Sequence, residues 1–294
     1  MNKFKVFTLL LGVLLLASAT SCKKKDGVYS PGKKIQKVYH SSTIMDKTLH
    51  QVWNWDGKLL ASIDYYSSNS DTVVWTERFT YDGNRIDRVD NIQESAIYEY
   101  DGNHLKSVKN YYHDNLETTT VFEYKSGKLD KATITYLHGG YKKSEASYPR
   151  LPVLPFPSEF TAIIDKCNAK LAIGNEPKSE YVLTYQFTWD SDNVVKIVAT
   201  YDGGTSSVAL QYDNKKNPYR GFMDLWSWEL DELEEGDNYV SKNNVTNMTF
   251  TYSDGDTEIS SFIYQYDSDN YPTMRTTHYP DAQYQYQYTT YYEY

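Results

Sequence analysis

The stretch Tyr81-Asp82-Gly83-Asn84-Arg85-Ile86 and its near copy Tyr100-Asp101-Gly102-Asn103-His104-Leu105 decide the fold of this chain. In both stretches, Asp-Gly and Gly-Asn supply residues that tolerate the positive φ angles of a tight hairpin turn. An aromatic residue ends the strand before the turn, and an aliphatic residue soon after the turn opens the next strand. Each stretch therefore predicts a β-hairpin.

The same phrase recurs along the chain with uneven spacing. Its flanks alternate with a period of two. Phe79 and Tyr81 therefore share one face of their strand, and Tyr98 and Tyr100 share one face of theirs. The pattern predicts an all-β fold, an antiparallel meander of consecutive hairpins that forms one large curled sheet or β-barrel. The other copies are Trp55-Asp56-Gly57-Lys58-Leu59, Tyr124-Lys125-Ser126-Gly127-Lys128-Leu129, Trp189-Asp190-Ser191-Asp192-Asn193-Val194 and Tyr266-Asp267-Ser268-Asp269-Asn270-Tyr271.

Two insertions interrupt the repeat. The first, residues 148–177, carries Pro149, Pro152, Pro155 and Pro157. The second runs from Asn217-Pro218-Tyr219 to the acidic run that ends at Glu235. Because the hairpin phrase resumes after each, we interpret them as excursions that plug or flank a single all-β domain, residues 35–294. A domain boundary at the proline stretch is the alternative.

The amino-terminal segment predicts export. A basic start is followed by an apolar run from Val6 to Ala17, which is shorter than the roughly 20 residues of a spanning helix. Ala19-Thr20-Ser21-Cys22 then resembles a bacterial lipobox, in which cleavage precedes the cysteine and the thiol carries lipid. We therefore predict a signal peptide over 1–21, and a lipidated Cys22 with a flexible tether over 22–34. An ordinary signal peptide with an incidental cysteine is the alternative.

Composition and net charge limit which classes of partner the chain is expected to bind. The chain has 30 Tyr, 10 Phe and 6 Trp, a bias that favours strands with at least one wet face. The formal net charge of −9 opposes binding to a phosphate backbone, so no nucleic-acid partner is expected. Cys167 is the one cysteine besides Cys22, which leaves no internal disulfide framework and favours a small buried residue there.

No motif predicts a metal, a cofactor or catalysis. Asp190-Ser191-Asp192 and Asp267-Ser268-Asp269 invite a calcium interpretation, but the twelfth positions of such loops hold Tyr201 and His278 instead of Glu. The six histidines lack zinc-ligand spacing, and no nucleophile elbow or phosphate loop occurs. A glycan-active enzyme is the less favoured alternative, and its carboxylate pair would come from the acidic run Glu229, Asp231, Glu232, Glu234 and Glu235.

These features together resemble known proteins. The tyrosine-aspartate phrases loosely resemble the repeats of bacterial Rhs-type shell proteins. The whole chain after the signal is more similar to a large family of Bacteroidetes lipoproteins of unknown function with a porin-like fold. That resemblance implies a strongly curved sheet, possible closure into a barrel, and no established site residues. It rests on Cys22, the hairpin phrases, Asn217-Pro218-Tyr219, Ser241-Lys242-Asn243-Asn244 and Asp267-Ser268-Asp269-Asn270-Tyr271-Pro272.

The last strand raises the alternative of an integral outer-membrane pore. Tyr284, Tyr286, Tyr288, Tyr292 and Tyr294 share one parity, which resembles the closing strand of outer-membrane barrels. A transmembrane barrel also needs an apolar, lipid-facing stripe on strands of about 9–11 residues. Residues 87–94 and 104–110 carry charges or amides on both parities, so we favour a barrel or curled sheet outside the bilayer.

The favoured function is an outer-membrane-anchored lipoprotein that acts as a non-catalytic binding or structural module. Its expected partners are the membrane, through the lipid, and glycans or cell-envelope proteins. Trp226 and Trp228 are the candidate ligand-binding residues, because they lie in an insertion and loops often carry function. The remaining tryptophans are candidates for the core or for the same stacking role.

Overall fold

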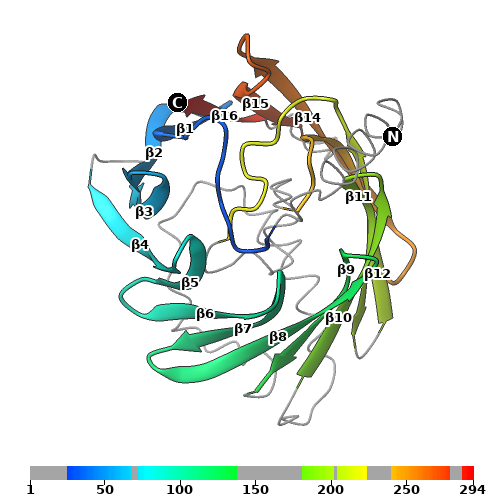
Figure 1. Cartoon of the computed structure of the whole chain (residues 1–294). Coiled ribbons are helices and arrows are strands. Elements are labelled where there is room, and N and C mark those ends of the chain that lie inside the picture. Colours follow the sequence, from blue (N-terminus) through cyan, green and yellow to red (C-terminus); the bar gives the residue numbers. More distant parts are fainter. Residues whose placement is uncertain (1–24, 68–71, 138–180, 202–203, 224–239, 279–286) are drawn as a thin grey trace, which may run out of the picture.

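The computed structural model describes residues 25–67, 72–137, 181–201, 204–223, 240–278 and 287–294. In these residues sixteen antiparallel strands follow one another in chain order around a closed barrel (Figure 1). The strands are β1 (Lys37–Ser42), β2 (Met45–Asp56), β3 (Leu59–Tyr66), β4 (Val73–Asp82), β5 (Arg85–Asp90), β6 (Glu94–Asp101), β7 (His104–Tyr112), β8 (Asn115–Lys125), β9 (Lys128–Tyr136), β10 (Tyr181–Asp190), β11 (Asn193–Tyr201), β12 (Gly204–Tyr212), β13 (Val245–Thr251), β14 (Thr257–Tyr266), β15 (Pro272–His278) and β16 (Gln287–Glu293).

The first and last strands close the ring. β1 pairs with β16 over six residue pairs, from Lys37 beside Glu293 to Ser42 beside Tyr288. The predicted all-β meander is therefore confirmed, and of the two forms left open, the curled sheet and the barrel, the structure is the barrel. Among the described residues, no helix is long and apolar enough to cross a membrane.

The turns of the repeated phrase lie at one end of the barrel, which we call the turn end. They join β2 to β3, β4 to β5, β6 to β7, β8 to β9 and β10 to β11. Gly57, Gly83 and Gly102 have φ angles of 54°, 64° and 57°, which explains why glycine recurs there. The Asp267 turn is of the same kind, since its carboxylate accepts the backbone N–H groups of Asp269 and Tyr271.

Alternation along each strand separates an interior from an exterior face. In β4, Glu77 and Phe79 are buried and face the interior, whereas Arg78 and Thr80 are exposed. In the last strand, Tyr288 and Tyr292 are buried and face inward. The shared parity of these tyrosines therefore reflects packing inside the barrel.

A strap of residues 25–36 crosses the mouth of the barrel at the turn end. Asp26 N–H donates to the Asn103 carbonyl, and Gly27 accepts a hydrogen bond from Ile86 N–H, both at 2.9 Å. Further along, Lys33 pairs with Asp267 at 2.6 Å on the opposite side of the ring. In Figure 1 this dark-blue segment runs inside the ring of strands before it joins β1. Residues 25–34, which belong to the predicted tether, are thus part of the folded barrel.

The described start of the second insertion, residues 217–223, plugs the same mouth. Phe222 is 3% exposed, and its ring centroid lies 4.9 Å from that of Trp53 and 5.3 Å from that of Tyr29. The Tyr29 hydroxyl donates to the Pro218 carbonyl at 2.9 Å, which joins strap to plug. The described residues of this insertion therefore pack inside the mouth, and we call them the plug.

Candidate functional site

A ring of aromatic side chains lies just inside the turn end, most of them directly before a turn. The hydroxyl or indole N–H groups of six of them donate to backbone carbonyls of neighbouring segments. Tyr81 donates to the Leu60 carbonyl at 2.8 Å, and Tyr100 donates to the Ile86 carbonyl at 2.6 Å. Trp55, Trp189, Tyr212 and Tyr294 donate in the same way to Ile35, Leu129, Val194 and Pro272.

The ring has a structural cause. Beside each turn the register slips, as between Thr80 and Tyr81 in β4, so that one extra residue bulges from the following strand. Pairing between successive hairpins also ends before the turn, which frees carbonyls that the aromatic side chains then satisfy. The sequence shows that an aromatic residue recurs before the turns. The carbonyl that it binds lies on another segment of the chain, so the spacing of residues around the turn could not reveal the hydrogen bond.

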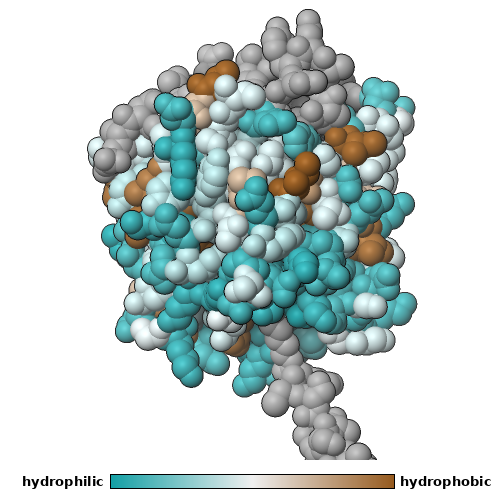
Figure 2. Space-filling model, turned by 90° about the horizontal axis from the view of Figure 1, so that it is seen from above, coloured by the Kyte–Doolittle hydropathy of each residue, from teal (hydrophilic) through white to brown (hydrophobic). Residues whose placement is uncertain are grey.

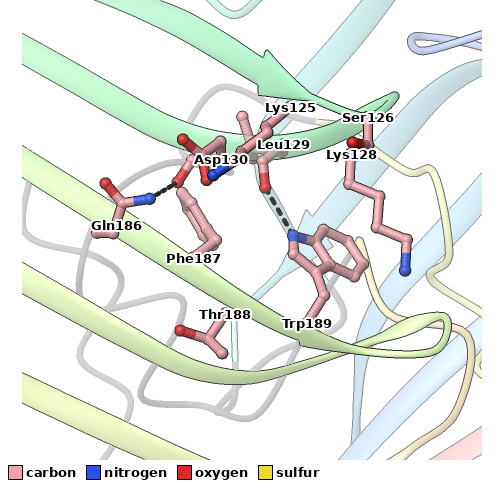
Figure 3. A pocket seen from close by; sticks show the side chains of 9 residues that line it. All are labelled: Lys125, Ser126, Lys128, Leu129, Asp130, Gln186, Phe187, Thr188 and Trp189. Atoms are coloured by element: carbon pink, nitrogen blue, oxygen red, sulfur yellow. Dashed lines mark hydrogen bonds between the residues drawn. The ribbon is translucent and has the colours of Figure 1, made fainter.

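A groove opens in the barrel wall where one of these junctions splays. Pairing between β9 and β10 ends at Lys131 and Gln186, although both strands continue to the turn end. The groove is open to solvent and has a volume of about 400 Å³. Its lining, drawn in Figure 3, consists of Lys125, Ser126, Lys128, Leu129, Asp130, Gln186, Phe187, Thr188 and Trp189.

Side chains of alternate parity build the floor and the rim of this groove. Phe187 and Leu129 are 5% exposed and form an apolar floor. Trp189 is half-buried, and its indole N–H is fixed by a 2.6 Å bond to the Leu129 carbonyl. Gln186 and Thr188 are exposed on the outer face, where the Gln186 amide donates to the Asp130 carbonyl at 2.7 Å (Figure 3). The arrangement offers an aromatic surface beside hydrogen-bonding groups.

Lysines flank the tryptophan. The Lys128 ammonium lies 5.5 Å from the centre of the Trp189 ring and donates to the Ser191 carbonyl of the next turn. Lys125 is exposed at the end of β8. With Asp130 as the one acidic side chain of the lining, the groove has a formal charge of +1, against −9 for the whole chain.

The residues predicted to carry function are not among those that the structure describes. Cys22, Trp226 and Trp228 fall outside the described residues, as do Cys167 and the acidic run at 229–235. Trp53 is 2% exposed and belongs to the core, which is the ordinary reading of a sheet tryptophan. Trp189, one of the remaining candidates, lines the groove, but no signal in the sequence separates it from the other aromatic residues before turns.

A second cluster of ionisable side chains lies in the interior beside the closing strands. The rings of His40 and His50 stack with centroids 3.9 Å apart, and the Tyr288 hydroxyl contacts His40 Nδ1. Burial lowers the pKa of His50 to about 4, and burial with the nearby His50 and Arg275 lowers the pKa of His40. Within the described part of the chain, no group of three or more His, Cys, Asp or Glu side chains could hold a metal ion.

Comparison with known proteins supports the fold alone. Neither a family model nor a curated protein matches the sequence. Among solved structures, a porin-like protein from Bacteroides uniformis is similar with a TM-score of 0.51 and 12% identity, over 90% of this chain and 99% of that chain. A porin-like protein from Bacteroides vulgatus has a TM-score of 0.47 and 10% identity, over 89% and 99% of the two chains. The chain thus shares its barrel architecture with a porin-like protein of Bacteroides.

Proposed function

We propose that this protein is a lipoprotein of the outer membrane whose barrel lies outside the bilayer and serves as a non-catalytic binding or structural module. One observation carries the proposal. The barrel is apolar inside its turn end and polar on its outer wall, the reverse of the pattern in a barrel that spans a membrane.

The outer wall supports the proposal through its polar contacts between strands. On β2, β3 and β4, Asp64 accepts hydrogen bonds from Asn54 at 2.8 Å and from Thr76 at 2.6 Å. On β6 and β7, Glu99 pairs with Lys109 at 2.6 Å. The charge of Lys109, near the middle of β7, would be costly against lipid, by roughly 2–4 kcal/mol for a lysine at the bilayer centre.

The apolar residues of the outer wall are scattered. Val121, Val182, Ile259 and Ile263 are 45–57% exposed and lie on β8, β10 and β14. The face shown in Figure 2 is mainly hydrophilic, with isolated hydrophobic residues and no continuous belt among its described residues. Isolated exposed aliphatic side chains are ordinary on water-facing surfaces.

The closed mouth also weighs against the alternative of an integral pore. At the turn end, Tyr29 of the strap and Phe222 of the plug pack against Trp53 of β2, and each of the three is 2–3% exposed. The porin-like fold favours the alternative, but fold does not fix function. The side-chain distribution favours the module.

The anchoring and the ligand class are further parts of the proposal. The lipobox at Cys22 would attach acyl chains, which hold a protein at a membrane without a spanning segment. Aromatic side chains beside amides and carboxylates suit carbohydrates, so the ligands proposed are glycans of the cell envelope or its surroundings.

Gel filtration in detergent-free buffer tests the location of the barrel. The chain from Lys23 onward should elute as a sharp, monomer-sized peak with β-type circular dichroism. Aggregation that detergent reverses would favour the pore, which bilayer conductance would then test. Anchoring is tested separately by labelling cells with a radioactive fatty acid, which the intact chain should incorporate and a Cys22→Ser variant should not.

A further inference from the structure

We infer that the groove between β9 and β10 binds a saccharide that carries an acidic group, with Trp189 as the surface on which the sugar ring stacks. This inference rests on the proposed binding of glycans and gives it a site and a ligand charge. It uses only side chains of the described residues.

The shape of the groove suits a sugar ring. Trp189 is held in place by its bond to the Leu129 carbonyl, so little freedom of the indole is lost when a ligand stacks on it. Phe187 and Leu129 supply an apolar floor for the C–H face of a pyranose. A volume of about 400 Å³ accommodates one to two sugar units.

Hydrogen-bonding groups stand at the rim where sugar hydroxyls would lie. The Gln186 amide donates to the Asp130 carbonyl, which fixes the side chain and leaves its Oε1 to accept from a ligand. The exposed Thr188 hydroxyl and the Asp130 carboxylate add a donor and further acceptors on the same rim. Pairing of β9 with β10 ends at Lys131 and Gln186, and the groove lies beyond this last pair, open to solvent.

Charge decides the ligand class. The lining holds two lysines, Lys125 and Lys128, and one aspartate, a formal charge of +1 on a chain of net charge −9. The Lys128 ammonium lies close to the Trp189 ring, near enough to pair with a substituent of a sugar stacked there. A carboxylate or a sulfate on the sugar would form an ion pair with the same two lysines. The ligand class that we infer is therefore a pyranose with a negatively charged substituent.

Trp55 offers a matched control for Trp189. Both residues precede a turn and belong to the aromatic ring, and both donate their indole N–H to a backbone carbonyl. Trp55, however, lies outside the groove. Tyrosine fills the equivalent place in other hairpins, such as Tyr81. Trp189→Tyr and Trp55→Tyr should therefore both preserve the ring, while only the first reduces the stacking surface of the groove.

The test is calorimetric titration of the purified full chain with three probes: a galacturonate trimer, a sulfated galactose trimer and the neutral galactose trimer. An acidic trimer should bind about tenfold more tightly than the neutral one. Trp189→Tyr should weaken that binding by about tenfold, and Trp55→Tyr should leave it unchanged. Lys125→Gln combined with Lys128→Gln should abolish the preference for the acidic trimer.

The contrary outcomes separate the two proposals. Binding that Trp189→Tyr does not weaken would overturn the groove but leave glycan binding intact. A neutral trimer that binds as well as both acidic ones would overturn the charge assignment. A folded protein that binds none of the three would overturn this inference, while the anchored barrel itself is judged by gel filtration and fatty-acid labelling.

Discussion

His40 and His50 show how a single pair of side chains couples the closing seam of the barrel to pH. Their stacked rings lie on β1 and β2, and His40 also contacts Tyr288 on β16. The Tyr65 ring lies 6.0 Å from His50, and Arg275 on β15 opposes a positive charge on His40. Both rings are therefore neutral at neutral pH, and protonation would place positive charge in a poorly solvated interior.

We expect acid to destabilise the protein through this pair. A histidine with an unfolded pKa near 6.5 and a folded pKa of about 4 binds its proton more readily when unfolded. Stability should thus fall as pH drops from about 6.5 to about 4, by roughly 2–3 kcal/mol for His50. Urea unfolding at pH 7.5 and pH 5 measures this. His50→Asn should reduce the difference in unfolding free energy between the two pH values. The control His113→Asn, in the exposed β7–β8 turn, should leave that difference unchanged. An equal difference in all three proteins would contradict the assignment.

At the scale of elements, the ring of aromatic side chains ties each hairpin to the next. Tyr81 reaches from β4 to the Leu60 carbonyl, across a junction where strand pairing has ended. Burial disfavours the charged phenolate and raises the pKa of Tyr81 to about 12. Tyr81→Phe keeps the ring but leaves the carbonyl without its donor, so unfolding free energy should fall by about 1 kcal/mol. Urea unfolding measures the loss, and a stabilised variant would show that the bond contributes nothing.

The plug is the second element whose energetic role can be measured. Phe222 packs against Trp53, Tyr29 and Phe79 with ring centroids 4.9–6.0 Å apart. Phe222→Ala would leave a cavity in this core and should cost about 3–5 kcal/mol. Val121→Ala, on the exposed outer face of β8, should change stability by less than about 0.5 kcal/mol. Similar losses in both variants would mean that the plug is only loosely attached.

The elements differ in how far the sequence predicts them. Asp82-Gly83 and Asp101-Gly102 encode their turns locally, so the hairpins and the meander follow from them. Closure could not follow, because β1 and β16 pair across the full length of the chain and no local signal fixes that register. The groove at Trp189 was equally hidden, since it depends on where β9 and β10 stop pairing.

At the scale of the whole molecule, lipidation of Cys22 would make the strap determine which end of the barrel faces the membrane. Asp26 is fixed at the turn end by its N–H bond to Asn103 and by the Leu105 N–H that donates to its carboxylate at 3.0 Å. Cys22 precedes Asp26 by four residues, which span at most about 14 Å. A ten-residue strand such as β4 extends about 33 Å, so the two ends of the barrel differ clearly in their reach from the lipid.

If Cys22 carries lipid, the turn end should therefore lie against the membrane and the opposite end should point away. Lys58 marks the turn end, and Ile92, which is 86% exposed in the β5–β6 turn, marks the opposite end. In a Cys167→Ser background, dyes on Lys58→Cys or Ile92→Cys should transfer energy to labelled lipid headgroups of vesicles, more efficiently from position 58. The unlipidated Cys22→Ser protein should show little transfer from either position. More efficient transfer from position 92 in the lipidated protein would mean that the strap does not set the orientation, even though the lipid anchors the chain.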